Sequence, residues 1–129
     1  LEQAATRRIE SGGWPQAMRQ GWSLDNGVLD LRPLLGELAG QRDAEQGAAL
    51  FHATLVAALS EWTQRACVSA GIETVALGGG CFFNRLLAVG LRRELEALGL
   101  RMLAPIKLVP GDAGLALGQA WVALHALEI

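Results

Sequence analysis

Cysteine and histidine are scarce in this 129-residue chain, and their scarcity excludes several kinds of site. The two cysteines, Cys67 and Cys81, match no CxxC metal or redox spacing, so we expect both to be reduced thiols. With only His52 and His125 available, no Cys/His metal cluster and no Ser/His/Asp set can be assembled, and no paired-carboxylate pattern is present. A complete active site is therefore not expected within the chain.

An excess of basic residues and long apolar runs are also missing. Eleven Lys and Arg against thirteen Asp and Glu give a net charge of -2, which offers no basic surface for nucleic acid. The N-terminus lacks the basic start and apolar core of a signal peptide, and the apolar stretches are broken well short of a membrane span. We therefore expect a cytoplasmic protein with neither nucleic acid nor membrane as a partner. Because the chain enters helix-like sequence directly at Leu1, we also expect an upstream portion.

What is present is ordinary globular composition, 51% hydrophobic and 19% charged, at a length that allows one domain. Local signals predict helices over residues 1–11, 31–38, 43–69, 84–98 and 113–127. Asp43 with Gln46 forms a capping-box pattern, and Asp112 is placed to cap the last helix. Asn26-Gly27 predicts a hairpin turn between two short strands.

Residues 73–103 carry the pattern of a βαβ unit. A β-prone run over 73–77 is followed by the helix that Asn84 can cap, and Gly99 ends that helix before a second run over 100–103. Strand, helix and strand within about thirty residues predict two parallel strands. The fold class is therefore α/β.

Three successive glycines, Gly78, Gly79 and Gly80, follow the first strand of this unit. Ligands of α/β proteins bind at the carboxyl ends of the strands, and glycines let a ligand approach the backbone. The free N–H groups of the following helix would favour an anionic group. The pattern is neither GxGxxG nor a P-loop. A turn that only lets strand and helix pack closely is the equally favoured alternative.

Other candidate residues have simpler interpretations. Asp112, in the turn Pro110-Gly111-Asp112, could bind a metal ion or a phosphate-bound cation, although a helix cap is the favoured role for a lone aspartate. His52, inside the long apolar helix, is interpreted as a hydrogen-bonded packing residue. Cys81, which has no neighbouring base, is interpreted as a small packed residue.

Two separated segments together resemble one family. Residues 75–87, VALGGGCFFNRLL, and residues 110–120, PGDAGLALGQA, are similar to the C-terminal end of the HypF hydrogenase-maturation carbamoyltransferases. The segments FHATL at 51–55, GVLD at 27–30 and PLL at 33–35 also fit that family. The resemblance spans nearly the whole chain.

This resemblance implies both a fold and an activity. Residues 1–129 would be one unit, the C-terminal half of a Kae1-like domain of the actin/sugar-kinase/Hsp70 (RNase H-like) nucleotide-binding class. The family uses carbamoyl phosphate and ATP to form a carbamoyl-adenylate. It then passes the carbamoyl group to the C-terminal cysteine of the protein HypE, as the precursor of the cyanide ligands of nickel–iron hydrogenase. The isolated chain would be inactive.

The resemblance also assigns site residues. Gly79, Gly80 and Asn84 match the family's nucleotide-facing motif, and Gly78 completes the turn where the family more often has serine. Asp112 matches an aspartate that completes a divalent metal site, zinc or iron, whose other ligands are histidines of an upstream motif. Cys81 and Phe83 stand where valine and glutamine are usual, and Phe83 lacks the polar group that a glutamine would offer the nucleotide.

Two alternatives remain open. The first is a related enzyme, a tRNA threonylcarbamoyl transferase or an O-carbamoyltransferase, that shares this half-domain. The second is a noncatalytic module that docks a partner or self-associates through the apolar helix over 43–69.

Overall fold

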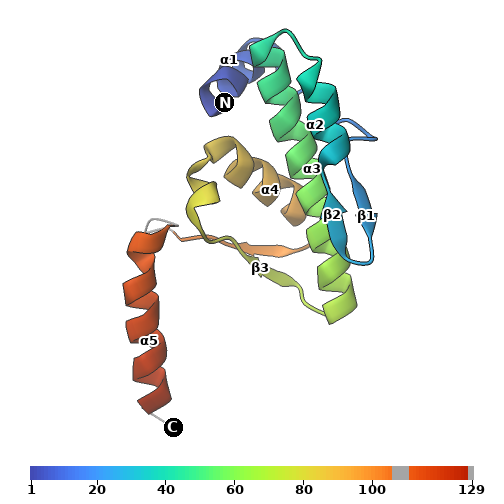
Figure 1. The fold of residues 1–129 in the computed structure, drawn as a ribbon. Helices are drawn as coiled ribbons and strands as arrows, with labels where there is room; N and C mark the ends of the chain where they lie inside the picture. The colour runs from blue at the N-terminus through green and yellow to red at the C-terminus, as the bar shows by residue number, and fades with distance from the viewer. Residues whose placement is uncertain (106–110, 128–129) are drawn as a thin grey trace.

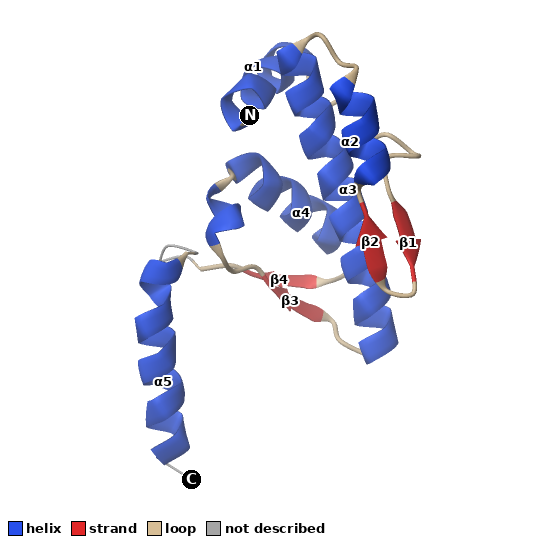
Figure 2. Cartoon of the chain, in the orientation of Figure 1, coloured by secondary structure: helices blue, strands red, loops and turns tan. Residues whose placement is uncertain are grey.

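One long helix, α3 (Ala44–Ala70), is the central element of the fold in the computed structural model, which describes residues 1–105 and 111–127 (Figures 1 and 2). Within those ranges no helix has the length and apolar character needed to cross a bilayer. The other elements, in chain order, are α1 (Glu2–Gly12), β1 (Ser23–Asp25), β2 (Val28–Asp30), α2 (Arg32–Ala39), β3 (Thr74–Ala76), the 3₁₀ turn η1 (Gly80–Phe83), α4 (Arg85–Ala97), β4 (Arg101–Leu103), the 3₁₀ turn η2 (Asp112–Gly114) and α5 (Leu115–Leu127).

The ends of α3 follow the local signals in the sequence. The Asp43 carboxylate accepts hydrogen bonds from two amides of the first turn, and Gly71 ends the helix with a positive φ of 65°. The predicted capping box is wrong in its second half. The side chain of Gln46 accepts a hydrogen bond from Arg8 Nε instead, and the Asp43 amide donates to Gln41 Oε1. A tertiary contact has therefore replaced a local one.

Two helices pack against α3 and form the core. Small residues bring α1 close to it, because Ala5, Ala48 and Ala49 are buried together. The second cluster joins α3 to α4 and to the parallel strands, and its buried members are Val56, Leu87, Leu91, Leu95 and Met102. At the crossing of α3 and α4, a Cβ added to Gly90 would lie 2.7 Å from Val56 Cγ2, so only glycine allows this close approach.

The predicted βαβ unit is confirmed. Strands β3 and β4 pair in parallel with Val75 opposite Met102, and α4 connects them. The pairing extends past the last strand residue, because the Leu77 amide donates to the Leu103 carbonyl over 2.8 Å. The carboxyl ends of both strands consequently lie at one edge of the sheet, from which residues 78–84 leave.

The predicted hairpin is also confirmed. Strands β1 and β2 pair in antiparallel register around Asn26 and Gly27, which have φ values of 48° and 78°. Positive φ at both central residues is the geometry of a type I′ turn. The indole Nε1 of Trp62 donates to the Gly27 carbonyl over 2.8 Å and so fastens the hairpin to α3.

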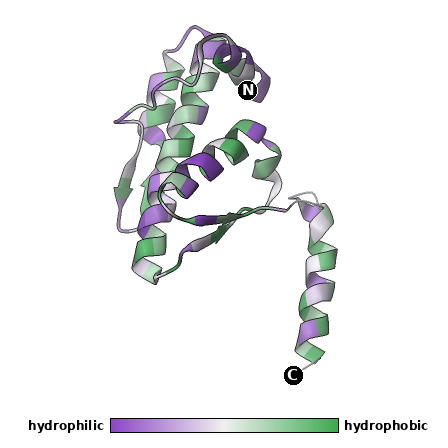
Figure 3. Cartoon of the chain, turned by 180° about the vertical axis from the view of Figure 1, so that it is seen from behind, coloured by the Kyte–Doolittle hydropathy of each residue, from purple (hydrophilic) through white to green (hydrophobic). Residues whose placement is uncertain are grey.

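The last helix differs from the prediction at its start. Asp112 is not at the N-cap position of α5, because the residue begins η2 and α5 starts three residues later. The 3₁₀ turn, in which the Gly114 amide donates to the Gly111 carbonyl, takes the place of a capping side chain. Helix α5 projects away from the other elements (Figure 1), and hydrophobic residues recur along it (Figure 3). None of its residues is buried.

Candidate functional site

The structure brings the two glycine turns together at the carboxyl edge of β3 and β4. The triglycine turn (Gly78, Gly79 and Gly80) follows β3 and runs into η1, which ends with Phe83. A Cβ added to Gly111, just before Asp112, would lie 2.9 Å from Phe83 Cε2, so the Phe83 ring packs directly on that glycine. The sequence predicted each turn but not their contact. Pro110, which belongs to the predicted second turn, lies outside the described residues.

The triglycine turn is open. All three of its glycines are exposed, and a Cβ added to any of them would meet no described atom within 4 Å. The alternative that these glycines let strand and helix pack closely is therefore wrong, because nothing in the described part of the chain packs against them. Gly79 additionally needs to be glycine, since its φ is 101°. The turn leaves its backbone accessible to a ligand.

Two amides at the N-terminus of α4, which the sequence predicted as free donors for an anion, are held by side chains of this chain. The Leu87 amide donates to Asn84 Oδ1 over 3.1 Å, which confirms Asn84 as the helix cap. The Arg85 amide donates to a carboxylate from α1, Glu2 Oε1, over 2.7 Å. These two donors are therefore already satisfied, whereas the Leu86 amide between them has no acceptor among the described residues. In the described ranges, the amides of Gly80 and Cys81 at the start of η1 have no acceptor.

The side chain of Asn84 also holds the buried His52, and the hydrogen bonds fix the protonation of the ring. Because Asn84 Oδ1 accepts from Leu87, its Nδ2 faces His52 Nε2 at 2.8 Å. Nδ2 can only donate, so Nε2 must be the acceptor and Nδ1 must carry the proton. Nδ1 then donates to the Ala48 carbonyl over 2.8 Å. His52 is fully buried, and the prediction of a hydrogen-bonded packing histidine is confirmed.

The remaining candidate residues are Asp112 and the two cysteines. Asp112 is exposed, and the described residues contain no group of three His, Cys, Asp or Glu side chains that could hold a metal ion. One carboxylate does not make a metal site, so the residues described here do not by themselves fit a divalent metal. Cys67 and Cys81 are both free thiols. The prediction that Cys81 is packed is wrong, because Cys81 is exposed, whereas the next residue, Phe82, packs against the core.

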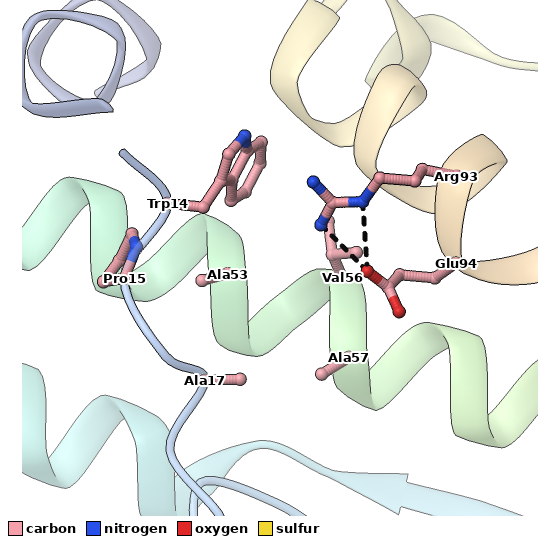
Figure 4. Close-up of a pocket in the computed structure, with 8 residues that line it drawn as sticks. All are labelled: Trp14, Pro15, Ala17, Ala53, Val56, Ala57, Arg93 and Glu94. Atoms are coloured by element: carbon pink, nitrogen blue, oxygen red, sulfur yellow. Dashed lines mark hydrogen bonds and ion pairs between the residues drawn. The ribbon is translucent and has the colours of Figure 1, made fainter. Parts of the chain in front are cut away.

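A separate hollow lies between α3, the C-terminal half of α4 and the segment around Trp14 (Figure 4). Its volume is about 190 Å³, and none of its lining residues belongs to a glycine turn. The Arg93 guanidinium lies 5.5 Å from the centre of the Trp14 ring and donates to Glu94 Oε1. The two charged side chains that line the hollow, Arg93 and Glu94, are thus paired with each other, and the hollow shows no feature of a ligand site.

Comparison with known proteins gives consistent matches. The family model for the carbamoyltransferase Kae1-like domain, second subdomain, matches residues 1–119. The chain is similar to carbamoyltransferase HypF2 of Cupriavidus necator, at 51% identity over 84% of this chain and 14% of that protein. It is 51% identical to a carbamoyltransferase HypF homolog of the same organism, over 76% of this chain and 26% of that protein. It is 43% identical to the HypF of Rhizobium leguminosarum bv. viciae, over 81% of this chain and 14% of that protein.

A solved structure matches as well. The crystal structure of full-length HypF in the phosphate- and nucleotide-bound form superposes with a TM-score of 0.75 at 27% identity, covering 88% of this chain and 16% of that one. The chain thus spans 14% to 26% of the length of the first two curated relatives. The family model and the identities show that the chain belongs to the HypF carbamoyltransferase family, in which it matches the second subdomain of the Kae1-like domain.

Proposed function

We propose that this chain forms one wall of the nucleotide site of a HypF-type carbamoyltransferase. Residues 1–129 would be one unit, the C-terminal half of a Kae1-like domain of the actin/sugar-kinase/Hsp70 class. The whole enzyme would use carbamoyl phosphate and ATP to form a carbamoyl-adenylate. It would pass the carbamoyl group to the C-terminal cysteine of a HypE-type protein during nickel–iron hydrogenase maturation. The isolated chain would be inactive, because it supplies no complete set of reacting groups.

The observation that supports this proposal most is the open triglycine turn at the carboxyl edge of the parallel strands. Phosphate oxygens accept hydrogen bonds from backbone amides, and the amides of Gly80 and Cys81 are available among the described residues. Three glycines without neighbours let a nucleotide lie directly on that backbone. The chain would then bind and orient the nucleotide without supplying a nucleophile. Gly78, Gly79, Gly80 and Asn84 are the proposed nucleotide residues, with Asn84 as the residue that ends the turn.

Asp112 is the only described residue that we propose as a ligand of a divalent metal, zinc or iron. Its carboxylate follows Gly111, which packs against Phe83 at the end of the nucleotide turn. Asp112 would therefore contribute one ligand, while the histidines of an upstream motif would supply the others.

The test is ATP binding by the complete polypeptide that carries this chain, compared between Gly80→Val and Gly36→Val. Both glycines lack positive φ, and a Cβ added at either position would meet no described atom within 4 Å. The Gly80→Val side chain would occupy the space above the nucleotide turn and should weaken ATP binding at least about tenfold. Gly36→Val in α2 should bind ATP like the unaltered protein. Equal binding by both variants would refute the proposed site.

A noncatalytic docking module is the second candidate, and one observation favours it. Helix α5 exposes large apolar side chains throughout its length: Leu115, Leu117, Trp121, Val122, Leu124 and Leu127. Such a surface is typical of a contact with another protein surface. The same titration separates the two candidates, because a docking module should bind no ATP even in the complete polypeptide.

A further inference from the structure

We infer that His52 is a positioning residue for the nucleotide turn and acts through the side chain of Asn84. The inference rests on the proposed function, since it explains how the turn that would hold the nucleotide is kept in place. His52 lies in the N-terminal half of α3, 32 residues before Asn84 in the sequence. It is fully buried, and both of its ring nitrogens are hydrogen-bonded.

Asn84 connects the histidine to the turn because it is both the C-cap of η1 and the N-cap of α4. Its backbone amide donates to the Cys81 carbonyl over 3.2 Å and closes η1, and its side-chain Oδ1 caps α4 through the Leu87 amide. Its Nδ2 is held by His52 Nε2. The position of Asn84 therefore sets where η1 ends, and with it the direction of the Gly80 and Cys81 amides at the start of the same short turn.

Only one arrangement satisfies every polar group in this chain of contacts. A His52 ring protonated at Nε2 would point an N–H at the Nδ2 donor of Asn84. Rotating the Asn84 amide to relieve that contact would turn Nδ2 toward the Leu87 amide and remove the cap. The other tautomer also removes the hydrogen bond that the ring donates to the Ala48 carbonyl. His52 thus supplies an acceptor at one fixed point, which a residue that merely fills the core would not do.

Two substitutions each keep one of the two hydrogen bonds of the His52 ring and remove the other. In His52→Gln, the side-chain amide reaches the position of Nε2 and keeps an acceptor for Asn84. In His52→Asn, the shorter amide reaches the position of Nδ1 and keeps only the bond to the Ala48 carbonyl. Val56→Ala, one turn further along α3 in the core, serves as a control that destabilises the fold without touching Asn84.

The experiment is a titration of the complete polypeptide with ATP, with the unfolding of each variant measured in parallel. His52→Asn should weaken ATP binding about tenfold, because the Asn84 amide loses the partner that orients it. His52→Gln and Val56→Ala should stay within about twofold of the unaltered protein. Unchanged binding by His52→Asn, or equal losses in His52→Asn and His52→Gln, would overturn the inference.

Failure of this inference can be told apart from failure of the proposed function. If the unaltered protein binds no ATP, both are refuted. If it binds ATP and Gly80→Val weakens that binding but His52→Asn does not, only the role of His52 is refuted. If His52→Asn does not fold, ¹⁵N NMR of the imidazole in the unaltered protein decides the question. We expect a neutral ring protonated at Nδ1, and a ring protonated at Nε2 would overturn the inference.

Discussion

The close crossing of α3 and α4 gives a quantitative prediction for Gly90. A Cβ at this position would lie 2.7 Å from Val56 Cγ2, 3.2 Å from Val56 Cγ1 and 3.5 Å from Trp14 Cη2. Overpacking of this kind costs about 1–3 kcal/mol, and replacing a helical glycine by alanine returns about 1 kcal/mol. Gly90→Ala should therefore lower the free energy of unfolding by about 1 kcal/mol.

A double-mutant cycle with Val56 tests the cause of that loss. Val56→Ala alone should cost about 2 kcal/mol, because its side chain is almost fully buried. In the double variant the added methyl group no longer meets the valine, so the helix-propensity gain remains and the total cost should be only about 1 kcal/mol. Urea unfolding followed by circular dichroism measures all three variants. Additivity of the two single effects within about 0.5 kcal/mol would refute the assigned contact.

Two further predictions concern carboxylates. The Arg32 side chain and amide donate to Asp30 and lower the pKa of that carboxyl from 3.8 to about 2; since the folded pKa is depressed, the stabilisation is present above pH 3.8 and is lost as the pH falls toward 2. Asp30→Asn should therefore flatten the pH dependence of the melting temperature between pH 3.8 and 2. A melting temperature that falls in this range as steeply as in the unaltered protein would contradict the stabilising role of Asp30. Asp112→Asn in the complete polypeptide should lower metal content and carbamoyl transfer together, whereas Asp25→Asn in the hairpin should change neither. Full metal content in Asp112→Asn, measured by atomic absorption, would remove Asp112 from the site.

Features that depend on neighbouring residues in the sequence could be predicted. Asn26-Gly27 requires positive φ in a hairpin, and the structure has it. Gly99, with a φ of 83°, follows the end of α4, and Asp43 caps α3 as its sequence context predicted. In each case a single residue type satisfies a local backbone requirement, so no tertiary information is needed.

Features that depend on distant contacts could not be predicted. The carboxylate that satisfies the Arg85 amide comes from Glu2, 83 residues away, and no periodicity in the sequence indicates that pairing. Asp112 looked like a helix cap because an acidic residue precedes an apolar run, but a 3₁₀ turn forms there instead. The candidate site was predicted as two separate turns. Their contact through Phe83 and the orientation of Asn84 by His52 exist only in the folded chain.

Amide hydrogen exchange of the complete polypeptide, with and without ATP, tests the central claim most directly. If the triglycine turn holds the nucleotide, ATP should slow exchange at the amides of residues 79–81, since bound phosphate oxygens would accept their hydrogen bonds. The amides of Arg85 and Leu87, which Glu2 and Asn84 already hold, should change much less. Saturating ATP that leaves exchange at residues 79–81 unchanged would contradict the claim that this chain forms a wall of the nucleotide site.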